Sequence, residues 1–159
     1  MAEWGNVKPV TKTIGGKTYT FKSLLEMRWA VWCQLRKEQG IIVDWEYEVT
    51  LLTYETKLGE VKIYRPDFTI ETKESADGYE YEETKGWFTS KDYTRMKYVS
   101  MQYDNPLTLI FENLTNCKSA RLQYGRAKRL EKLLESNGGR VIYEAGKTIL
   151  KPIRHLFDE

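Results

Sequence analysis

The chain has 159 residues, of which 41% are hydrophobic and 30% charged, and its formal net charge is +2. This balance is typical of a single folded globular domain and excludes a disordered chain. Its apolar runs are far shorter than the roughly 20 residues that a membrane-spanning helix needs, so no membrane span is expected. The two cysteines fall in no CxxC pattern, which excludes a disulfide framework and a cysteine-based zinc cluster.

The opening residues, MAEWGNVKP, contain no apolar signal core. Secretion is therefore not expected, and the thiols are expected to stay reduced. We expect a cytoplasmic protein, located in the cytoplasm of the host cell if its source is a virus.

The charges are distributed unevenly along the chain. Residues 41–83 carry twelve acidic side chains and four basic ones, whereas residues 84–132 carry ten basic side chains and four acidic ones. An acidic half can hold a cation and a basic half can hold a polyanion. The same pattern is also typical of two solvated surfaces of opposite sign.

The first predicted elements are a hairpin and a helix. A hairpin is expected over residues 11–21, with two glycines at its turn. Ser23 has the position of a helix N-cap, and the helix is expected to run to about Gln39, before Gly40 stops it. Alternating apolar residues, Val43, Trp45, Tyr47, Val49 and Leu51 on one parity, then predict a half-buried strand over residues 41–54.

The rest of the chain alternates between strands and helices. The expected elements are, in order, strands over 61–72 and 79–84, a helix over 90–103, a strand over 107–111, a helix over 119–136 and a short strand over 141–143. The turn Asp77-Gly78 joins the first two of these strands as a hairpin. The order predicts an α/β or α+β fold, in which helices pack on one mixed β-sheet.

No linker or repeat divides the chain, so a single domain over residues 1–159 is expected. Its core is expected over about 17–112, followed by a C-terminal helix and tail over 113–159.

Two acids and a lysine carry the predicted chemistry. Asp67 follows Pro66 in one expected strand, and Glu83 and Lys85 point to the same side of the next. Strands in a hairpin lie about 4.8 Å apart, so the two carboxylates and the ammonium can converge. Like charges so close repel unless a cation lies between them, and oxygen ligands favour Mg²⁺, with Mn²⁺ as a substitute. Lys85 would then orient or help to deprotonate a nucleophilic water.

A second ExK triplet, Glu71 to Lys73, has the same parity. It lies on the same expected strand as Asp67, and at about 3.3 Å per residue Glu71 is roughly 13 Å away. One ion cannot bridge that distance, so we assign the site to Glu83 and Lys85.

Glu26 has two interpretations. It follows Ser23 by three residues, which is the spacing of a capping box. It also lies on a helix face that is expected to be buried, where an unpaired acid is costly, so it is equally a candidate metal-site residue.

These residues resemble a known signature. Pro66-Asp67 with Glu83-x-Lys85 resembles the motif of the PD-(D/E)xK nuclease superfamily. Within it, residues 21–26 (FKSLLE) resemble the FRSxLE-type opening of the phage endonuclease I family of Holliday-junction resolvases. Residues 65–68 (RPDF) resemble its TPDF segment, and residues 83–87 (ETKGW) its ETKG segment.

The resemblance covers about residues 17–100. It implies a restriction-endonuclease-like core and an active site made of Glu26, Asp67, Glu83 and Lys85, with the carbonyl of Thr84 as a further metal ligand. It also implies a homodimer that places two active sites on branched DNA. The hairpin between the two acids is longer and more acidic than in that family, and the C-terminal third shows no match.

Several cations and one aromatic residue are expected to contact DNA. Trp87, Lys91, Arg95 and Lys97 follow the predicted active site and combine phosphate-binding cations with a stacking surface. Ser90 is expected to cap the helix that carries these cations. A second basic cluster over residues 126–132 either binds the DNA backbone or forms the solvated face of its helix.

Three functions stay open at this point. The first is a metal-dependent, structure-selective endonuclease that resolves four-way junctions in phage DNA. The second is a restriction-, repair- or transposition-type nuclease that cuts ordinary duplex DNA. The third is a non-catalytic DNA-binding module of the same fold.

Overall fold

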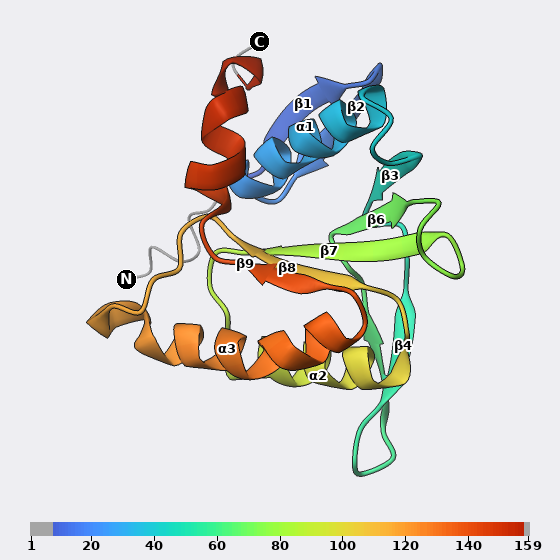
Figure 1. Cartoon of the computed structure of the whole chain (residues 1–159), viewed down its shortest axis with the longest axis vertical. Helices are drawn as coiled ribbons and strands as arrows, with labels where there is room; N and C mark the ends of the chain where they lie inside the picture. The colour runs from blue at the N-terminus through green and yellow to red at the C-terminus, as the bar shows by residue number, and fades with distance from the viewer. Residues whose placement is uncertain (1–7, 158–159) are drawn as a thin grey trace.

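The computed structural model describes residues 8–157, and its centre is a five-stranded mixed sheet (Figure 1). The strands lie in the order β3 (Asp44–Tyr47), β6 (Phe68–Glu71), β7 (Tyr79–Lys85), β8 (Leu107–Phe111) and β9 (Arg140–Ile142). The pairs β3–β6 and β6–β7 are antiparallel, whereas β7–β8 and β8–β9 are parallel. The predicted fold class, a mixed sheet flanked by helices, is confirmed.

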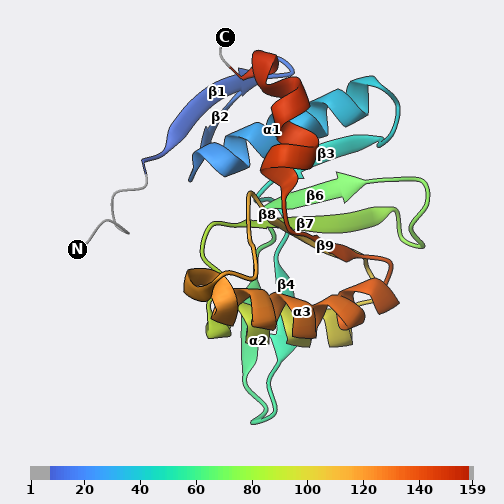
Figure 2. The same cartoon turned by 60° about the vertical axis from the view of Figure 1, so that its left-hand side comes forward.

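Helices cover both faces of the sheet (Figures 1 and 2). One face carries α1 (Leu24–Glu38) and a C-terminal segment made of the π-helix η3 (Gly146–Leu150) and the 3₁₀-helix η4 (Lys151–Leu156). The other face carries α2 (Ser90–Gln102) and α3 (Arg121–Ser136), which the short 3₁₀-helix η2 (Lys118–Ala120) precedes. Each face has its own apolar core.

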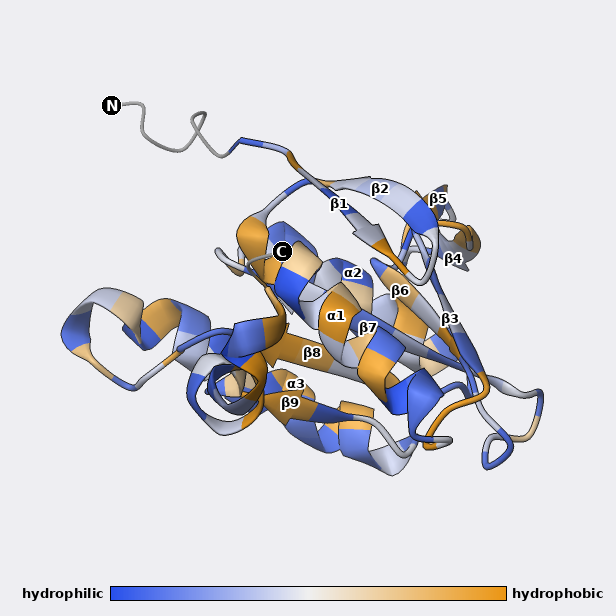
Figure 3. Cartoon of the chain, turned by 90° about the horizontal axis from the view of Figure 1, so that it is seen from above, coloured by the Kyte–Doolittle hydropathy of each residue, from blue (hydrophilic) through white to orange (hydrophobic). Residues whose placement is uncertain are grey.

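Strand β8 runs between the two cores, and its apolar character is visible in Figure 3. Leu109 and Ile110 alternate between the two cores, and both are fully buried. A continuous apolar run is what a central strand covered on both faces requires.

Two hairpins complete the fold. β1 (Val10–Ile14) and β2 (Lys17–Phe21) pair across a turn at Gly15 and Gly16, as predicted, and pack against α1. β4 (Leu52–Glu55) and β5 (Val61–Tyr64) form a separate hairpin that projects beyond α2 (Figure 1).

Two predicted strands are each divided in the structure. Residues 41–54 form β3 and β4 in different sheets, because the chain turns at Glu48, the one described non-glycine residue with a positive φ, 55°. Residues 61–72 form β5 and β6, which are separated at Pro66, a residue without an N–H for a strand ladder. The prediction of one half-buried face is wrong for Val43, Val49 and Leu51, which are exposed.

Helix α1 begins and ends as predicted, at the Ser23 cap and before Gly40, which has a φ of 76°. The cap of α2 was predicted one residue too late. Thr89 is its N-cap, and Thr89 and Asp92 form a reciprocal capping box, so Ser90 is the first residue of the helix.

Within residues 8–157, no helix has both the length and the apolar character that crossing a membrane requires. The prediction that the chain is not secreted rests on the opening residues 1–9, of which 1–7 lie outside the described range. The two ends of the predicted domain over 1–159 also lie outside it.

Candidate active site

Asp67 and Glu83 lie opposite each other on neighbouring chain segments. Phe68 of β6 pairs with Glu82 of β7, so Asp67, one residue before β6, faces Glu83. The backbone N–H of Asp67 donates to Oε1 of Glu83 at 3.1 Å. Both acids are buried, with exposed fractions of 2% and 5%. The expectation that these two acids meet across the β6–β7 hairpin is confirmed.

Each carboxylate is held by neutral donors through one oxygen. Oδ2 of Asp67 accepts hydrogen bonds from the N–H and the hydroxyl of Thr84, both at 2.9 Å. Oε1 of Glu83 also accepts from the hydroxyl of Tyr64 at 2.8 Å. The second oxygens face ammonium groups: Oδ1 of Asp67 is 3.7 Å from Nζ of Lys22, and Oε2 of Glu83 is 3.3 Å from Nζ of Lys85.

The Lys85 ammonium lies between two acids, Glu83 at 3.3 Å and Asp92 of α2 at 3.1 Å. Burial disfavours the charged form of Lys85, but the two carboxylates outweigh burial and raise its pKa. Lys85 is therefore protonated at neutral pH. Of its two predicted roles, orienting the nucleophilic water fits this state, and removing a proton from it does not.

The two buried acids have perturbed proton affinities. Burial raises the pKa of Asp67. Burial, together with the charge of Asp67, raises the pKa of Glu83 to about 7. The pair therefore carries unfavourable negative charge near neutral pH, and a cation bound between the carboxylates would relieve it.

Glu26 lies near this pair, and its backbone N–H and its carboxylate form hydrogen bonds with different partners. Its backbone N–H donates to the hydroxyl of Ser23, which is half of a capping box. Its buried carboxylate instead accepts from the N–H of Lys22 and the hydroxyl of Tyr47. Burial and the charge of Asp67 raise its pKa. Both interpretations of Glu26 thus describe part of the structure.

A lysine that the sequence analysis did not select connects these acids. Nζ of Lys22 is 2.8 Å from Glu48, 3.7 Å from Glu26 and 3.7 Å from Asp67. Burial disfavours its charged form, but these carboxylates raise its pKa. Its spacing of four residues from Glu26 is the only sequence signal for this contact, and nothing in the sequence places Glu48 there.

The acidic side chains near Asp67 offer fewer ligands than a cation site built entirely from protein groups. Among residues 8–157, no three His, Cys, Asp or Glu side chains are grouped so that they could hold a metal ion. Glu26 therefore does not join Asp67 and Glu83 as a third ligand in this geometry. Mg²⁺ is commonly held by one or two carboxylates and retains several waters, so the oxygens of Asp67 and Glu83 still fit it.

A cleft of about 720 Å³ opens beside these residues, and Glu26, Thr84, Lys85 and Trp87 are among those that line it. Asp67 and Glu83, which are both buried, are not among the residues that line it. A pocket of this size accommodates a segment of a larger ligand.

The four residues predicted to contact DNA fall in three places. Lys91 and Arg95 line a groove of about 370 Å³ between α2 and the β4–β5 hairpin, together with Lys62, which the sequence analysis missed. Lys97 is exposed on α2 and is not among the residues that line this groove. Trp87 lines the cleft at the active site and is half exposed.

The rejected ExK triplet lies elsewhere. Glu71 is exposed and pairs with Tyr79 at the far end of the β6–β7 ladder from Asp67. Glu82 of β7 faces α1 instead, where Arg36 binds its two oxygens at 2.7 and 2.9 Å and Trp29 donates at 2.7 Å.

The geometry thus defines a class of site: two buried carboxylates and a lysine where β6 begins and β7 ends in the interior of a mixed sheet, beside an open cleft. Comparison of the chain with models of protein families, with curated proteins and with solved structures finds no match.

Proposed function

We propose that the chain is a metal-dependent endonuclease of the PD-(D/E)xK type that hydrolyses phosphodiester bonds in DNA. The observation that supports this most is the convergence of Asp67, Glu83 and Lys85 beside a cleft large enough for a nucleic-acid segment.

In this proposal Asp67 and Glu83 hold Mg²⁺, for which Mn²⁺ substitutes, and the bound cation supplies charge stabilisation for the phosphate. The carbonyl of Thr84 is the further ligand that the sequence resemblance implies. Tyr64 and Thr84 fix the carboxylates through hydrogen bonds, so little reorganisation is needed when the cation binds.

Lys85 acts as a cation in the reaction. Its ammonium, positioned by Glu83 and Asp92, donates to a non-bridging phosphate oxygen and orients the attacking water. A bond forms between the water oxygen and phosphorus while the phosphorus–oxygen bond to one sugar breaks; the attacking water releases a proton to solvent, and the leaving sugar oxygen takes one up and becomes a hydroxyl. The ammonium of Lys22 lies between the carboxylates of Glu26 and Asp67 and partly neutralises both.

The proposed substrate is a branched DNA, in the first place a four-way junction, and the proposed active form is a homodimer. Both follow from the resemblance of residues 21–26, 65–68 and 83–87 to the phage endonuclease I family. The β4–β5 hairpin supports a homodimer, because its residues Leu58, Val61 and Ile63 are between 61% and 88% exposed and apolar.

The deciding experiment compares cleavage of a four-way junction with cleavage of linear duplexes that have the same arms. Each substrate is tested with Mg²⁺ and with EDTA. Cleavage of the junction alone, lost in EDTA, is the expected result. Equal rates on both substrates would favour the duplex-cutting alternative, and DNA binding without any cleavage would favour the non-catalytic module.

A further inference from the structure

The active-site cleft is the middle of three adjoining grooves. It shares Glu112 with a groove of about 530 Å³ below the C-terminal helical segment, and it shares Trp87 with a groove of about 300 Å³ at the start of α3. We call these three adjoining grooves, which meet at Glu112 and at Trp87, the track.

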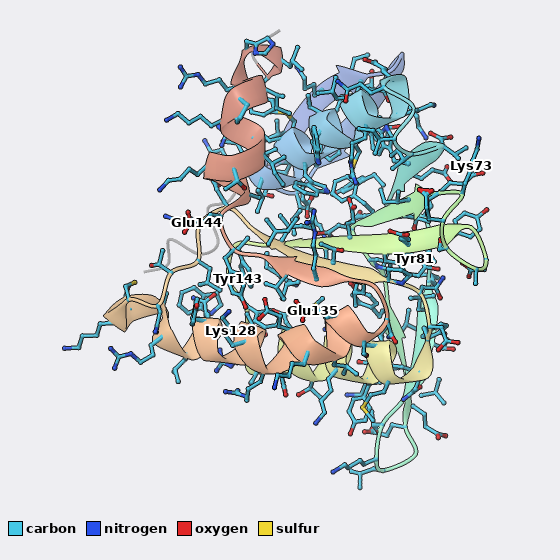
Figure 4. The ribbon with its side chains drawn as sticks, in the orientation of Figure 1. Lys73, Tyr81, Lys128, Glu135, Tyr143 and Glu144 are labelled. Carbon is cyan, nitrogen blue, oxygen red and sulfur yellow. The ribbon has the colours of Figure 1, made fainter. Side chains whose placement is uncertain are left out.

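One end of this track is basic. Arg28 of α1 and Lys151, Arg154 and His155 of η4 line the groove, and its only acidic residue is Glu112. Figure 4 shows side chains with nitrogen tips projecting from the outer side of this helical segment. Lys151 follows Lys147 by four residues in the wide π-helix, and Arg154 follows Lys151 by three residues in the tighter 3₁₀-helix. Each spacing is about one turn of its helix, so the three side chains lie on roughly the same side of the segment.

Arg28 is positioned in this groove by contacts that leave some of its N–H groups without a hydrogen-bond acceptor. Its guanidinium lies over the ring of Phe157, 5.7 Å from the centroid. One of its terminal nitrogens is 3.8 Å from Glu112, and its Nε is buried without a hydrogen-bond partner. A guanidinium is suited to phosphate because it presents several donors in a fixed plane.

The other end of the track is also basic. Lys118 and Arg126 line the groove beside Trp87, and Lys118 is exposed. Arg126 donates to the carbonyl of Phe88 at 3.0 Å, which fixes its side chain near the active-site loop. The active-site cleft therefore adjoins one basic groove at Glu112 and another at Trp87. Of these bases, Arg126 belongs to the basic cluster over residues 126–132, for which the sequence analysis left DNA binding and a solvated helix face open.

We propose that the backbone of a duplex DNA arm lies along this track, with phosphates bound by Arg28, Lys151 and Arg154 at one end and by Lys118 and Arg126 at the other. This proposal rests on the proposed function, because it places the scissile phosphate in the middle groove. Bases at both ends fit a long polyanion better than a single small anion, which would need only one of them.

The test measures binding of a short fluorescent duplex by anisotropy, in EDTA and over a range of salt concentrations, so that binding is read without cleavage. The variants are Lys151→Glu with Arg154→Glu at one end and Lys118→Glu at the other. Lys73→Glu is the matched control, because Lys73 is an exposed lysine in the β6–β7 loop on the opposite side of the molecule (Figure 4). Circular dichroism checks that each variant is folded.

The double variant should bind at least about tenfold more weakly than the control, and the slope of log K against log salt should fall by about 0.9 for each phosphate contact that is lost. Lys118→Glu should also bind more weakly than the control, and its slope of log K against log salt should fall by about 0.9, because one phosphate contact is lost. Binding of these variants equal to that of Lys73→Glu overturns the track.

The binding and cleavage results are separable. If the parent chain cleaves DNA while the variants bind like the control, the track is wrong and the nuclease stands. If the chain binds but never cleaves, and the variants lose binding, the track stands and the nuclease is wrong. A parent chain that binds no DNA overturns both.

Discussion

The backbone N–H of Asp67 donates a hydrogen bond to Oε1 of Glu83 at 3.1 Å, while the carboxylate of Asp67 accepts from Thr84, the next residue along β7. The two segments therefore bind each other reciprocally, main chain to side chain, at the point where β6 begins. This exchange fixes both acids, which are buried, where β6 begins and β7 ends.

If Asp67 holds the cation as proposed, Asp67→Asn should lower the rate of Mg²⁺-dependent DNA cleavage by about a thousandfold or more, because it removes a charged ligand worth several kcal/mol in the transition state. DNA binding should remain roughly unchanged. Single-turnover cleavage and anisotropy measure the two effects. Full cleavage activity in the variant would show that the site has been assigned to the wrong acid.

Lys85→Arg should retain more activity than Lys85→Met, because the role of this residue is a fixed positive charge between Glu83 and Asp92. Since the pKa of Lys85 is raised, its loss of a proton does not limit the rate near neutral pH. The pH–rate profile of Lys85→Arg should thus have the same shape as that of the parent chain. A basic limb that disappears in the variant would contradict this.

The cation-free protein should become less stable as pH rises from about 4.5 to about 7. The pKa of Glu83 is raised from its ordinary value of 4.5 to about 7 by burial and by Asp67, with Lys85 and Tyr64 opposing. The neutral acid contributes its full stability below pH 4.5 and loses it as pH rises through 7.

The measurement for Glu83 is the melting temperature in EDTA of the parent chain and of Glu83→Gln. The variant should gain about 5 °C relative to the parent between pH 5 and pH 8. Saturating Mg²⁺ should reduce this difference, because the cation binds the charged form. A difference that does not change with pH contradicts the raised pKa.

Arg36→Met should destabilise the fold by about 3 to 5 kcal/mol, because it leaves the carboxylate of Glu82 buried without its cation. Lys37→Met is the matched control: Lys37 forms an exposed ion pair with Asp44, which contributes at most about 1 kcal/mol. Urea unfolding measures both. Equal urea midpoints for Arg36→Met and Lys37→Met would mean that the ion pair of Arg36 with buried Glu82 does not stabilise the fold more than an exposed ion pair does.

Glu48→Gly should be more stable than Glu48→Ala by about 1 kcal/mol, because only glycine adopts the positive φ of this position without a steric cost. Both variants lose the ion pair with Lys22, so their difference isolates the backbone contribution. Urea midpoints in which alanine equals or exceeds glycine would contradict the strain at this turn.

Most helices and strands could be predicted because caps, turn glycines and apolar runs are each encoded by a few neighbouring residues. The Ser23 cap, the glycines at positions 15 and 16 and the apolar run of β8 each depend on residues within a few positions of one another. The two divided strands were not predictable in this way. Alternation continues through Val49 and Leu51, but the turn at Glu48 sends these residues into a separate hairpin.

Local backbone geometry is enough to predict the order of the three α-helices and the parity that puts Glu83 and Lys85 on one side of β7, so both could be read from the amino-acid sequence. The folded chain alone shows that Asp67 is level with Glu83, that Lys22 and Glu48 lie beside it, and that three grooves adjoin at the candidate site. These depend on strand register and on contacts between residues far apart in the chain, which no short window of sequence encodes.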